Sequence, residues 1–213
     1  MDQKLRQRMD RALATVDPRG TIGPRLKQDA DRLWHRCERL LKLGLLAGEV
    51  DREALEIACY TLFLPVRAAP PRQPGSTLRT SLRDRTEQAA ELLIGTVGSD
   101  ASEDLIDRVT NILLAMPHRK PALEESRLLA DACNLDDFGL IGMINRTIAL
   151  AGQGDGINQL VNGDVNRELY GYWEARLKDG FHFTAVRDLA RERVANARAA
   201  ARMLGEELKG DMP

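Results

Sequence analysis

Residues 128–146 read LLADACNLDDFGLIGMINR, and this stretch decides the fold assignment. Its acidic cluster of Asp131, Asp136 and Asp137 comes where a helix should end, and an apolar run interrupted by glycines follows at once. Carboxylates in the last turn of a helix meet the negative end of the helix dipole, which costs stability unless something compensates. The stretch therefore predicts either a solvent-exposed helix end or a site that holds a metal, another cation or hydrogen-bond donors.

The charge and composition of the chain narrow the classes of protein that need considering. Its 213 residues include 31 basic and 32 acidic ones, so no net charge attracts it to nucleic acid or to an anionic membrane. Aromatic residues make up 4% of the chain, fewer than β-sandwiches and barrels typically use. We expect one all-α domain spanning residues 1–213, with no nucleic-acid and no membrane partner.

The cysteines and the N-terminal segment predict a location. Cys37, Cys59 and Cys133 are an odd number without paired spacing, and each lies in an apolar helical context typical of a free thiol. The first residues, MDQKLRQRMDR, lack the apolar core of a signal peptide. No apolar run reaches the roughly 20 residues of a membrane span. The sequence predicts a reduced, cytoplasmic protein.

Apolar residues recur at three- and four-residue steps along most of the chain, the spacing of one helix face. The N-caps expected are Asp51, Ser102 and Thr184, and Pro121 is expected at the first position of its helix. Two exposed loops are predicted, a proline-rich one over about 65–78 and a glycine-rich one over about 151–164. Helices are predicted over residues 26–46, 53–64, 78–96, 103–116, 121–135, 165–178 and 184–208.

Two further segments extend the pattern of residues 128–146. HRCER at 35–39 lies on the first core helix, and YWEARLKDGFHFTAVRDLARERV at 172–194 leads into the last helix. In this order the segments resemble the HD-domain superfamily of metal-dependent phosphohydrolases, and within it a bacterial branch whose last motif reads approximately DADRLDAIGAIGIAR. The resemblance covers roughly residues 33–206. The last motif matches at Asp131, Leu135, Asp136, Gly139, Ile141, Gly142 and Arg146.

The resemblance implies an HD-domain-like helical bundle and, in active members, a divalent metal that activates water for attack on a phosphate ester. The metal is held by a histidine, which His35 matches, by an adjacent His-Asp pair and by a final aspartate. The pair aligns with Leu62 and Phe63, and the final aspartate aligns with Cys133. Leucine and phenylalanine offer no lone pair, and Mg²⁺ or Mn²⁺ needs several oxygen or imidazole donors. We therefore expect no metal and no other cofactor.

An alternative is a metal site rebuilt from other residues. The chain has three histidines, and His118 falls where this branch often keeps a histidine near its pocket. A set of His35, His118, Asp131 and Cys133 is conceivable. However, Asp131 and Cys133 are about 200° apart around one helix, so both cannot point inward unless the helix ends between them.

Several of these residues have simpler structural interpretations. His35 is expected to hydrogen-bond a backbone carbonyl, and Arg39 to pair with Glu38 or a later carboxylate. Asp131 and Asp136 are expected to brace the helix–helix turn through backbone N–H groups. Catalysis is the less favoured role for these two aspartates.

The glycines and the arginine at the end of the stretch have their own interpretations. Gly139 and Gly142 suit close backbone packing or a turn. Arg146 either reaches back to the acidic cluster or offers its guanidinium to a phosphate.

Two other features are better explained without chemistry. GQGDG at 152–156 superficially suggests a phosphate loop, but no strand precedes it and no Gly-Lys-Ser/Thr follows. The arginine-rich final helix alternates with glutamate and alanine, as a solvated face does.

The sequence thus predicts an HD-domain-like protein that has lost phosphohydrolase activity and acts by binding a protein partner or a small phosphorylated ligand. A divergent active phosphohydrolase with a rebuilt site, and a divalent metal, is the alternative. A third hypothesis is a homo-oligomer assembled through the last helix, with Val194 and Leu204 in its interface. The residues expected around the remnant pocket are His35, Arg39, Leu62, Phe63, His118, Asp131, Cys133 and Arg146.

Overall fold

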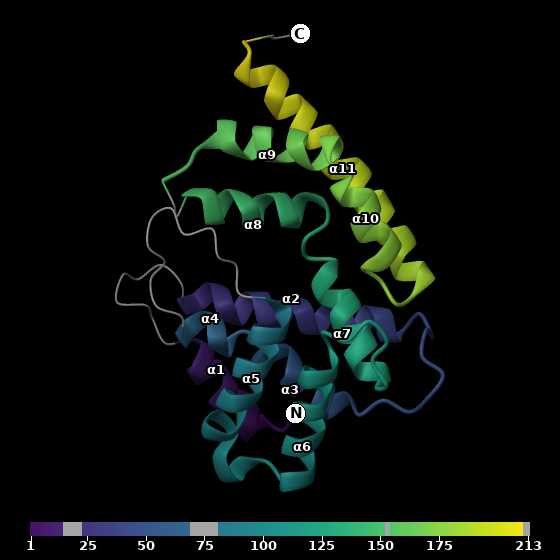
Figure 1. Ribbon diagram of the computed structural model, residues 1–213. Coiled ribbons are helices and arrows are strands. Elements are labelled where there is room, and N and C mark those ends of the chain that lie inside the picture. Colours follow the sequence, from purple (N-terminus) through teal and green to yellow (C-terminus); the bar gives the residue numbers. More distant parts are fainter. Residues whose placement is uncertain (15–22, 69–80, 152–153, 211–213) are drawn as a thin grey trace. The chain divides into compact units, whose positions relative to one another are not determined.

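The structure, a computed structural model of the chain, describes residues 1–14, 23–68, 81–151 and 154–210 (Figure 1). These residues form helices joined by turns and contain no strand, which confirms the predicted all-α class. They fall into two compact units, and the division between the units comes after Ala132, inside one helix. None of the helices in the described ranges is both long enough and apolar enough to cross a membrane.

The first unit contains α1 to α6 and most of α7. In chain order these are α1 (Gln3–Ala14), α2 (Gly23–Leu41), α3 (Arg52–Thr61), α4 (Leu64–Ala68), α5 (Leu82–Val97), the short 3-10 helix η1 (Gly98–Asp100), α6 (Glu103–Ala115) and α7 (Glu124–Asn134). Helix α3 packs against α2 and α6, α5 packs against α6, and α1 packs against α2 and α5. Leu33, Leu55 and Ile112 are fully buried in this unit.

Side-chain caps begin several of these helices. Asp51 accepts from the backbone N–H of Ala54 at 2.9 Å, and Ser102 caps α6 in the same way, as predicted. Ser81 and Asp84 form a reciprocal capping box at the start of α5. Each cap satisfies an N–H that the helix itself leaves without a partner.

The structure adds one helix to the prediction for this unit and corrects two boundaries. Helix α1 is not predicted, although Leu5, Met9 and Leu13 recur every four residues and are buried. The proline-rich loop does not begin at 65, because Pro65 lies in the first turn of α4, where its missing N–H costs no hydrogen bond. Residues 69–78 of that predicted loop lie outside the described residues. Helix α7 begins at Glu124 rather than at Pro121.

The second unit contains α8 (Gly139–Ala151), α9 (Ile157–Leu169), α10 (Tyr172–Asp179) and α11 (Thr184–Leu208). Helix α11 packs against α8, α9 and α10. Phe138, Trp173 and Phe181 form an aromatic core, with both rings centred 5.2 Å from Phe138. Aromatic residues are few in this chain, and three of them stabilise this one cluster.

The predicted loop over 151–164 is wrong for residues 157–164, which form the first part of α9. Gly156 is extended at the N-cap, and its N–H donates to Oε1 of Gln159 at 3.0 Å. The buried residues of this helix are Leu160, which is 4% exposed, and Asp164, which is 8% exposed.

The predicted helix 165–178 is interrupted in the structure. The chain turns at Gly171, whose φ of +61° is accessible to glycine without strain, and α10 begins at the next residue. The final helix has its predicted bounds, but its N-cap is Phe183, and Thr184 is the first helical residue.

Candidate functional site

The residues that resemblance assigns to a pocket on α2 lie on its exposed face. His35 is exposed, and its Nδ1 donates to the carbonyl oxygen of Asp31 at 2.6 Å, which is the bond expected of a structural histidine. Arg39 is also exposed. The ion pair that Glu38 makes is with Arg52, at 3.5 Å, rather than with Arg39.

Arg36 is the inward-facing residue of this helix turn, and it was not among the predicted site residues. Its side chain is buried, and Nη1 donates to the carbonyl oxygen of Ala132 in α7 at 2.9 Å. A helical signal could have found it, because Arg36 follows Leu33 by three residues and precedes Leu40 by four, and both leucines are buried.

The acidic end of α7 is divided between a buried and a partly exposed residue. Asp131 is 0% exposed, whereas Cys133 is partly exposed. This difference follows from the angle of about 200° between them. Beyond α7 the chain turns, with the N–H of Asp136 donating to the carbonyl of Cys133 and that of Asp137 to Asn134, both at 3.0 Å.

Leu62 and Phe63 occupy the end of α3, where the resemblance places a His-Asp pair. Leu62 is 0% exposed, and Phe63 is half-buried. Arg85 of α5 contacts both residues, because its Nε donates to the carbonyl of Leu62 at 2.9 Å and its guanidinium lies 5.2 Å from the ring centre of Phe63. These two side chains add apolar packing to the first unit.

The donor set does not fit a divalent metal. His118 is exposed like His35, whereas Asp131 is fully buried. The side chains of Leu62 and Phe63 carry no atom that can coordinate a metal ion. Within the described ranges, no group of three or more His, Cys, Asp or Glu residues is arranged to hold a metal ion.

A network of charged and hydroxyl groups surrounds Asp31 in the first unit. Its carboxylate accepts from Lys27 Nζ at 2.8 Å, from the Tyr60 hydroxyl and from Arg6 at 3.1 Å. Burial opposes ionisation of Asp31, but the hydrogen bonds from Lys27 and Tyr60 outweigh it and hold its pKa below the ordinary value. Burial, together with the bond to Asp31, raises the pKa of Tyr60.

Arg146 belongs to the second unit, where its guanidinium lies among α8, α9 and α10. Its Nη2 contacts Oδ1 of Asp164 at 2.9 Å, and its Nη1 donates to the carbonyl oxygen of Asp137 at 3.4 Å. The guanidinium lies 5.6 Å from the ring centre of Trp173. Arg146 therefore does reach back to the acidic cluster, through a backbone oxygen.

Two more arginines, neither of them a predicted site residue, join Arg146. Arg167 Nη1 contacts the same Oδ1 of Asp164 at 3.1 Å. Arg176 Nη2 contacts Oδ2 of Asp137 at 3.0 Å and Oδ1 of Asn134 at 2.9 Å. Arg146, Arg167 and Arg176 are called the arginine cluster below. A sequence signal exists only for the short-range Asp164–Arg167 spacing of three residues.

Comparison with known proteins identifies a fold and no family. No family model matches the chain, and no curated protein matches its sequence. Two crystal structures of Bacillus subtilis YpgQ match its fold, one in complex with ADP and one of the selenomethionine protein. Each has a TM-score of 0.58 and 20% sequence identity and covers 99% of this chain. The matches cover 94% and 93% of the YpgQ chains. At this identity the likeness shows the fold alone.

Proposed function

We propose that this protein is an HD-domain-like protein without metal-dependent phosphohydrolase activity that acts by binding a small phosphorylated ligand. The absence of phosphohydrolase activity is proposed because Leu62 is 0% exposed at a position where the resemblance requires a metal ligand. A buried leucine offers no lone pair, and it stabilises the fold by about 1.5–3 kcal/mol through burial. At this position, we infer that the side chain contributes apolar packing instead of metal coordination.

Arg36 of α2 also supports the proposal that the first unit holds no metal. Its buried guanidinium donates to the carbonyl of Ala132, the residue that follows the fully buried Asp131. A guanidinium is charged at every physiological pH and offers no lone pair to a metal. The guanidinium of Arg36 therefore places a positive charge against α7, the helix that carries Asp131.

The ligand class is supported by the fold match and by the second unit. YpgQ, which has a similar fold, was crystallised with ADP, a diphosphate. In this chain, Arg146, Arg167 and Arg176 provide guanidinium groups of the kind that recognise phosphate. We therefore propose a nucleoside diphosphate, or a small molecule with a similar phosphate group, as the ligand.

Two measurements on the purified full-length protein test this proposal. Isothermal titration calorimetry with ADP should show saturable binding. Incubation of the protein with Mn²⁺ and ADP, or with Mn²⁺ and nucleoside triphosphates, should release no phosphate or pyrophosphate. The His35→Ala variant should bind ADP like the unmodified protein, because His35 bonds only a backbone carbonyl among the described groups. Stoichiometric bound metal, or turnover that His35→Ala abolishes, would instead establish the divergent hydrolase.

A further inference from the structure

The arginine cluster concentrates positive charge from three helices of the second unit. Arg146 comes from α8, Arg167 from α9 and Arg176 from α10. One carboxylate oxygen, Oδ1 of Asp164, is shared by Arg146 at 2.9 Å and by Arg167 at 3.1 Å. With Asp137 on Arg176, the described charges of the cluster are three positive and two negative. The acidic groups thus compensate the arginines incompletely.

The cluster also contains a buried hydrogen-bond donor that no described residue satisfies. Nε of Arg146 is shielded from solvent and has no hydrogen-bond partner among the described residues. Burial lowers the pKa of Arg146, and the charge of Arg167 lowers it further, against the opposing effect of Asp164. Native proteins seldom leave a buried donor unsatisfied. An added anion would supply both the missing charge and further acceptor oxygens.

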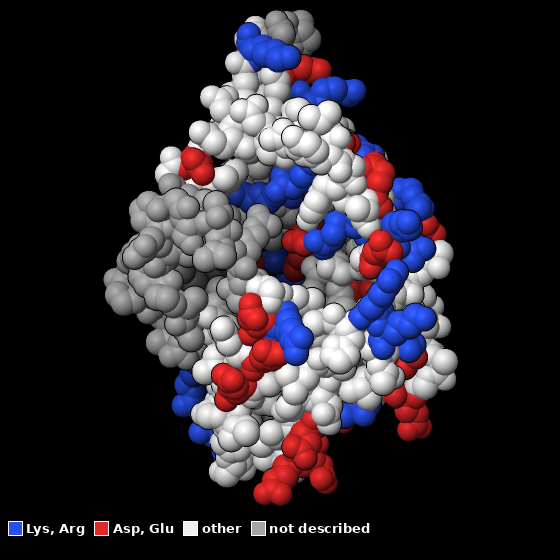
Figure 2. Space-filling view, in the orientation of Figure 1, with Lys and Arg blue, Asp and Glu red and all other residues white. Residues whose placement is uncertain are grey.

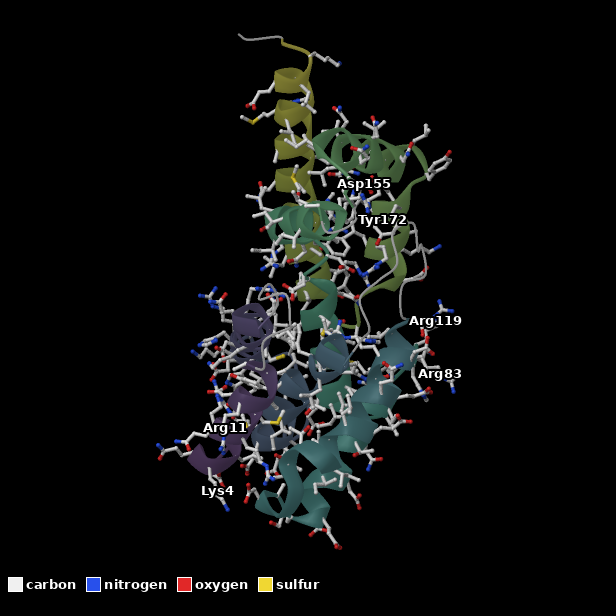
Figure 3. The ribbon with its side chains drawn as sticks, turned by 90° about the vertical axis from the view of Figure 1, so that its left-hand side faces the viewer. Lys4, Arg11, Arg83, Arg119, Asp155 and Tyr172 are labelled. Atoms are coloured by element: carbon white, nitrogen blue, oxygen red, sulfur yellow. The ribbon has the colours of Figure 1, made fainter. Side chains whose placement is uncertain are left out.

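Aromatic rings hold the guanidiniums in place. Arg167 and Arg176 each lie 5.7 Å from the ring centre of Tyr172, and Arg176 Nη1 donates to the Tyr172 hydroxyl at 3.1 Å. Tyr172 is labelled in Figure 3, where it lies on the second unit. The side chains of Arg167 and Arg176 are 21% and 29% exposed, so a solute can reach both. Such contacts orient an arginine without neutralising it.

We propose that the arginine cluster, with Tyr172 beside it, is the binding site for the phosphate groups of the ligand, a diphosphate in particular. This inference rests on the proposed function and locates it in the second unit. Two guanidiniums beside one ring suit a group with several anionic oxygens, because each planar fork can donate two parallel hydrogen bonds. Asp137 is 59% exposed, so its carboxylate can yield its place on Arg176 to a stronger anion.

The surface charge argues against a nucleic acid as the ligand. The chain carries a formal net charge of −1, and Figure 2 shows acidic and basic side chains interspersed over the visible face. Non-specific nucleic-acid binding requires an extended basic surface. The mixed charge of this face suits a small anion better than a nucleic acid.

Trp173 offers a direct readout, since the Arg146 guanidinium lies 5.6 Å from its ring. The chain has two tryptophans, Trp34 and Trp173, so Trp34→Phe leaves Trp173 as the only source of indole fluorescence. Titration of this variant with inorganic pyrophosphate should change the Trp173 emission saturably. In the same background, Arg167→Gln and Arg176→Gln should each weaken binding at least about tenfold, since each removes charge-assisted hydrogen bonds.

A matched arginine provides the control. Arg198 of α11 belongs to the same unit, but Glu168 at 2.7 Å and Glu174 at 2.7 Å already engage it. Arg198→Gln should leave pyrophosphate affinity within about twofold, as expected for an exposed ion pair outside the site. Asp137→Asn should tighten binding, because it removes the anion that competes for Arg176. A gain in affinity cannot result from misfolding, so this variant is informative even if an arginine variant unfolds.

The outcomes separate this site from the proposed function. ADP binding that is unchanged in Arg167→Gln and Arg176→Gln overturns the site and leaves a binding function standing. Hydrolysis of ADP overturns the proposed function, while pyrophosphate binding that depends on both arginines still establishes the site. Absence of saturable binding of both ADP and pyrophosphate overturns both.

Discussion

A β-carbon added at Gly142 would lie 2.2 Å from the carbonyl oxygen of Asp137. The same β-carbon would lie 3.0 Å from the carbonyl oxygen of Asp136, so the obstacle is backbone rather than a movable side chain. The backbone at Asp137 cannot easily move away from Gly142, because the N–H of Asp137 donates to the carbonyl oxygen of Asn134 and the adjacent Phe138 is buried. Close packing against Gly142, predicted from the sequence, is confirmed.

Gly142→Ala should therefore destabilise the protein by about 1–3 kcal/mol, the usual cost of overpacking. Gly95→Ala is the matched control. Gly95 lies inside α5 with nothing within 4 Å of an added β-carbon, so alanine should stabilise the helix by about 0.5–1 kcal/mol. Urea unfolding of the two variants should give changes of opposite sign. Equal effects would show that the Gly142 contact is not constraining.

Arg36 and Arg39 are one helical turn apart and should respond differently to the same substitution. Arg36→Met removes the donor to the carbonyl of Ala132 and should cost about 1.5–3 kcal/mol, because the hydrogen bond is buried and charge-assisted. Arg39 is exposed, and Arg39→Met should change the free energy of unfolding by less than about 0.5 kcal/mol. A reversed order in chemical unfolding would contradict the inward placement of Arg36.

Stability should depend on pH through Tyr60 and Asp31. The pKa of Tyr60 is raised by burial and by the bond to Asp31, so the tyrosine loses its proton in the unfolded chain at a lower pH than in the folded protein. Its contribution to the free energy of unfolding is therefore complete below about pH 10 and falls above it. The pKa of Asp31 is lowered, so its contribution is complete above about pH 4 and falls below it.

Tyr60→Phe should flatten the alkaline loss of stability in urea unfolding measured from pH 3 to 11. Tyr170→Phe is the control, because Tyr170 is 79% exposed. Asp31→Asn should flatten the acidic loss. An alkaline profile that Tyr60→Phe leaves unchanged would contradict the role assigned to Tyr60.

The hypothesis of self-association through the last helix can be tested with two residues of α11. Val194 is 1% exposed within the chain, so Val194→Asp should destabilise the protein severely by burying an unpaired carboxylate. Met203 is 58% exposed, and Met203→Asp should fold normally. Size-exclusion chromatography with light scattering then decides the matter. If the unmodified protein is oligomeric and Met203→Asp is monomeric, the exposed face of α11 is an interface.

The fold was predictable where one face of a helix carries a regular apolar stripe. Helix α11 has such a stripe, and its predicted bounds are those observed. Helix α9 has one glycine at its N-cap, Gly156, and one in its middle, Gly163. Their turn propensity masked a helix that packing against α11 stabilises. Helix propensity is a weak signal that such tertiary contacts override.

The candidate site was less predictable, for two physical reasons. The motif includes His35 because of its residue type, whereas burial follows the phase of the helix and places Arg36 inward. The arginine cluster depends on contacts between α8, α9 and α10, and no short-range spacing in the sequence encodes the meeting of Arg146 with Arg167. Arg146 was identified because the motif contains it, and its neighbours were not.

The contact between Arg36 and the carbonyl of Ala132 has a consequence for how the first unit responds to its surroundings. A metal ion that links two helices can be removed by a chelator, and its binding varies with the supply of the ion and with pH. A guanidinium is part of the chain and keeps its proton. The link between α2 and α7 is therefore made as soon as the two helices meet, and it survives EDTA, metal starvation and mild acid.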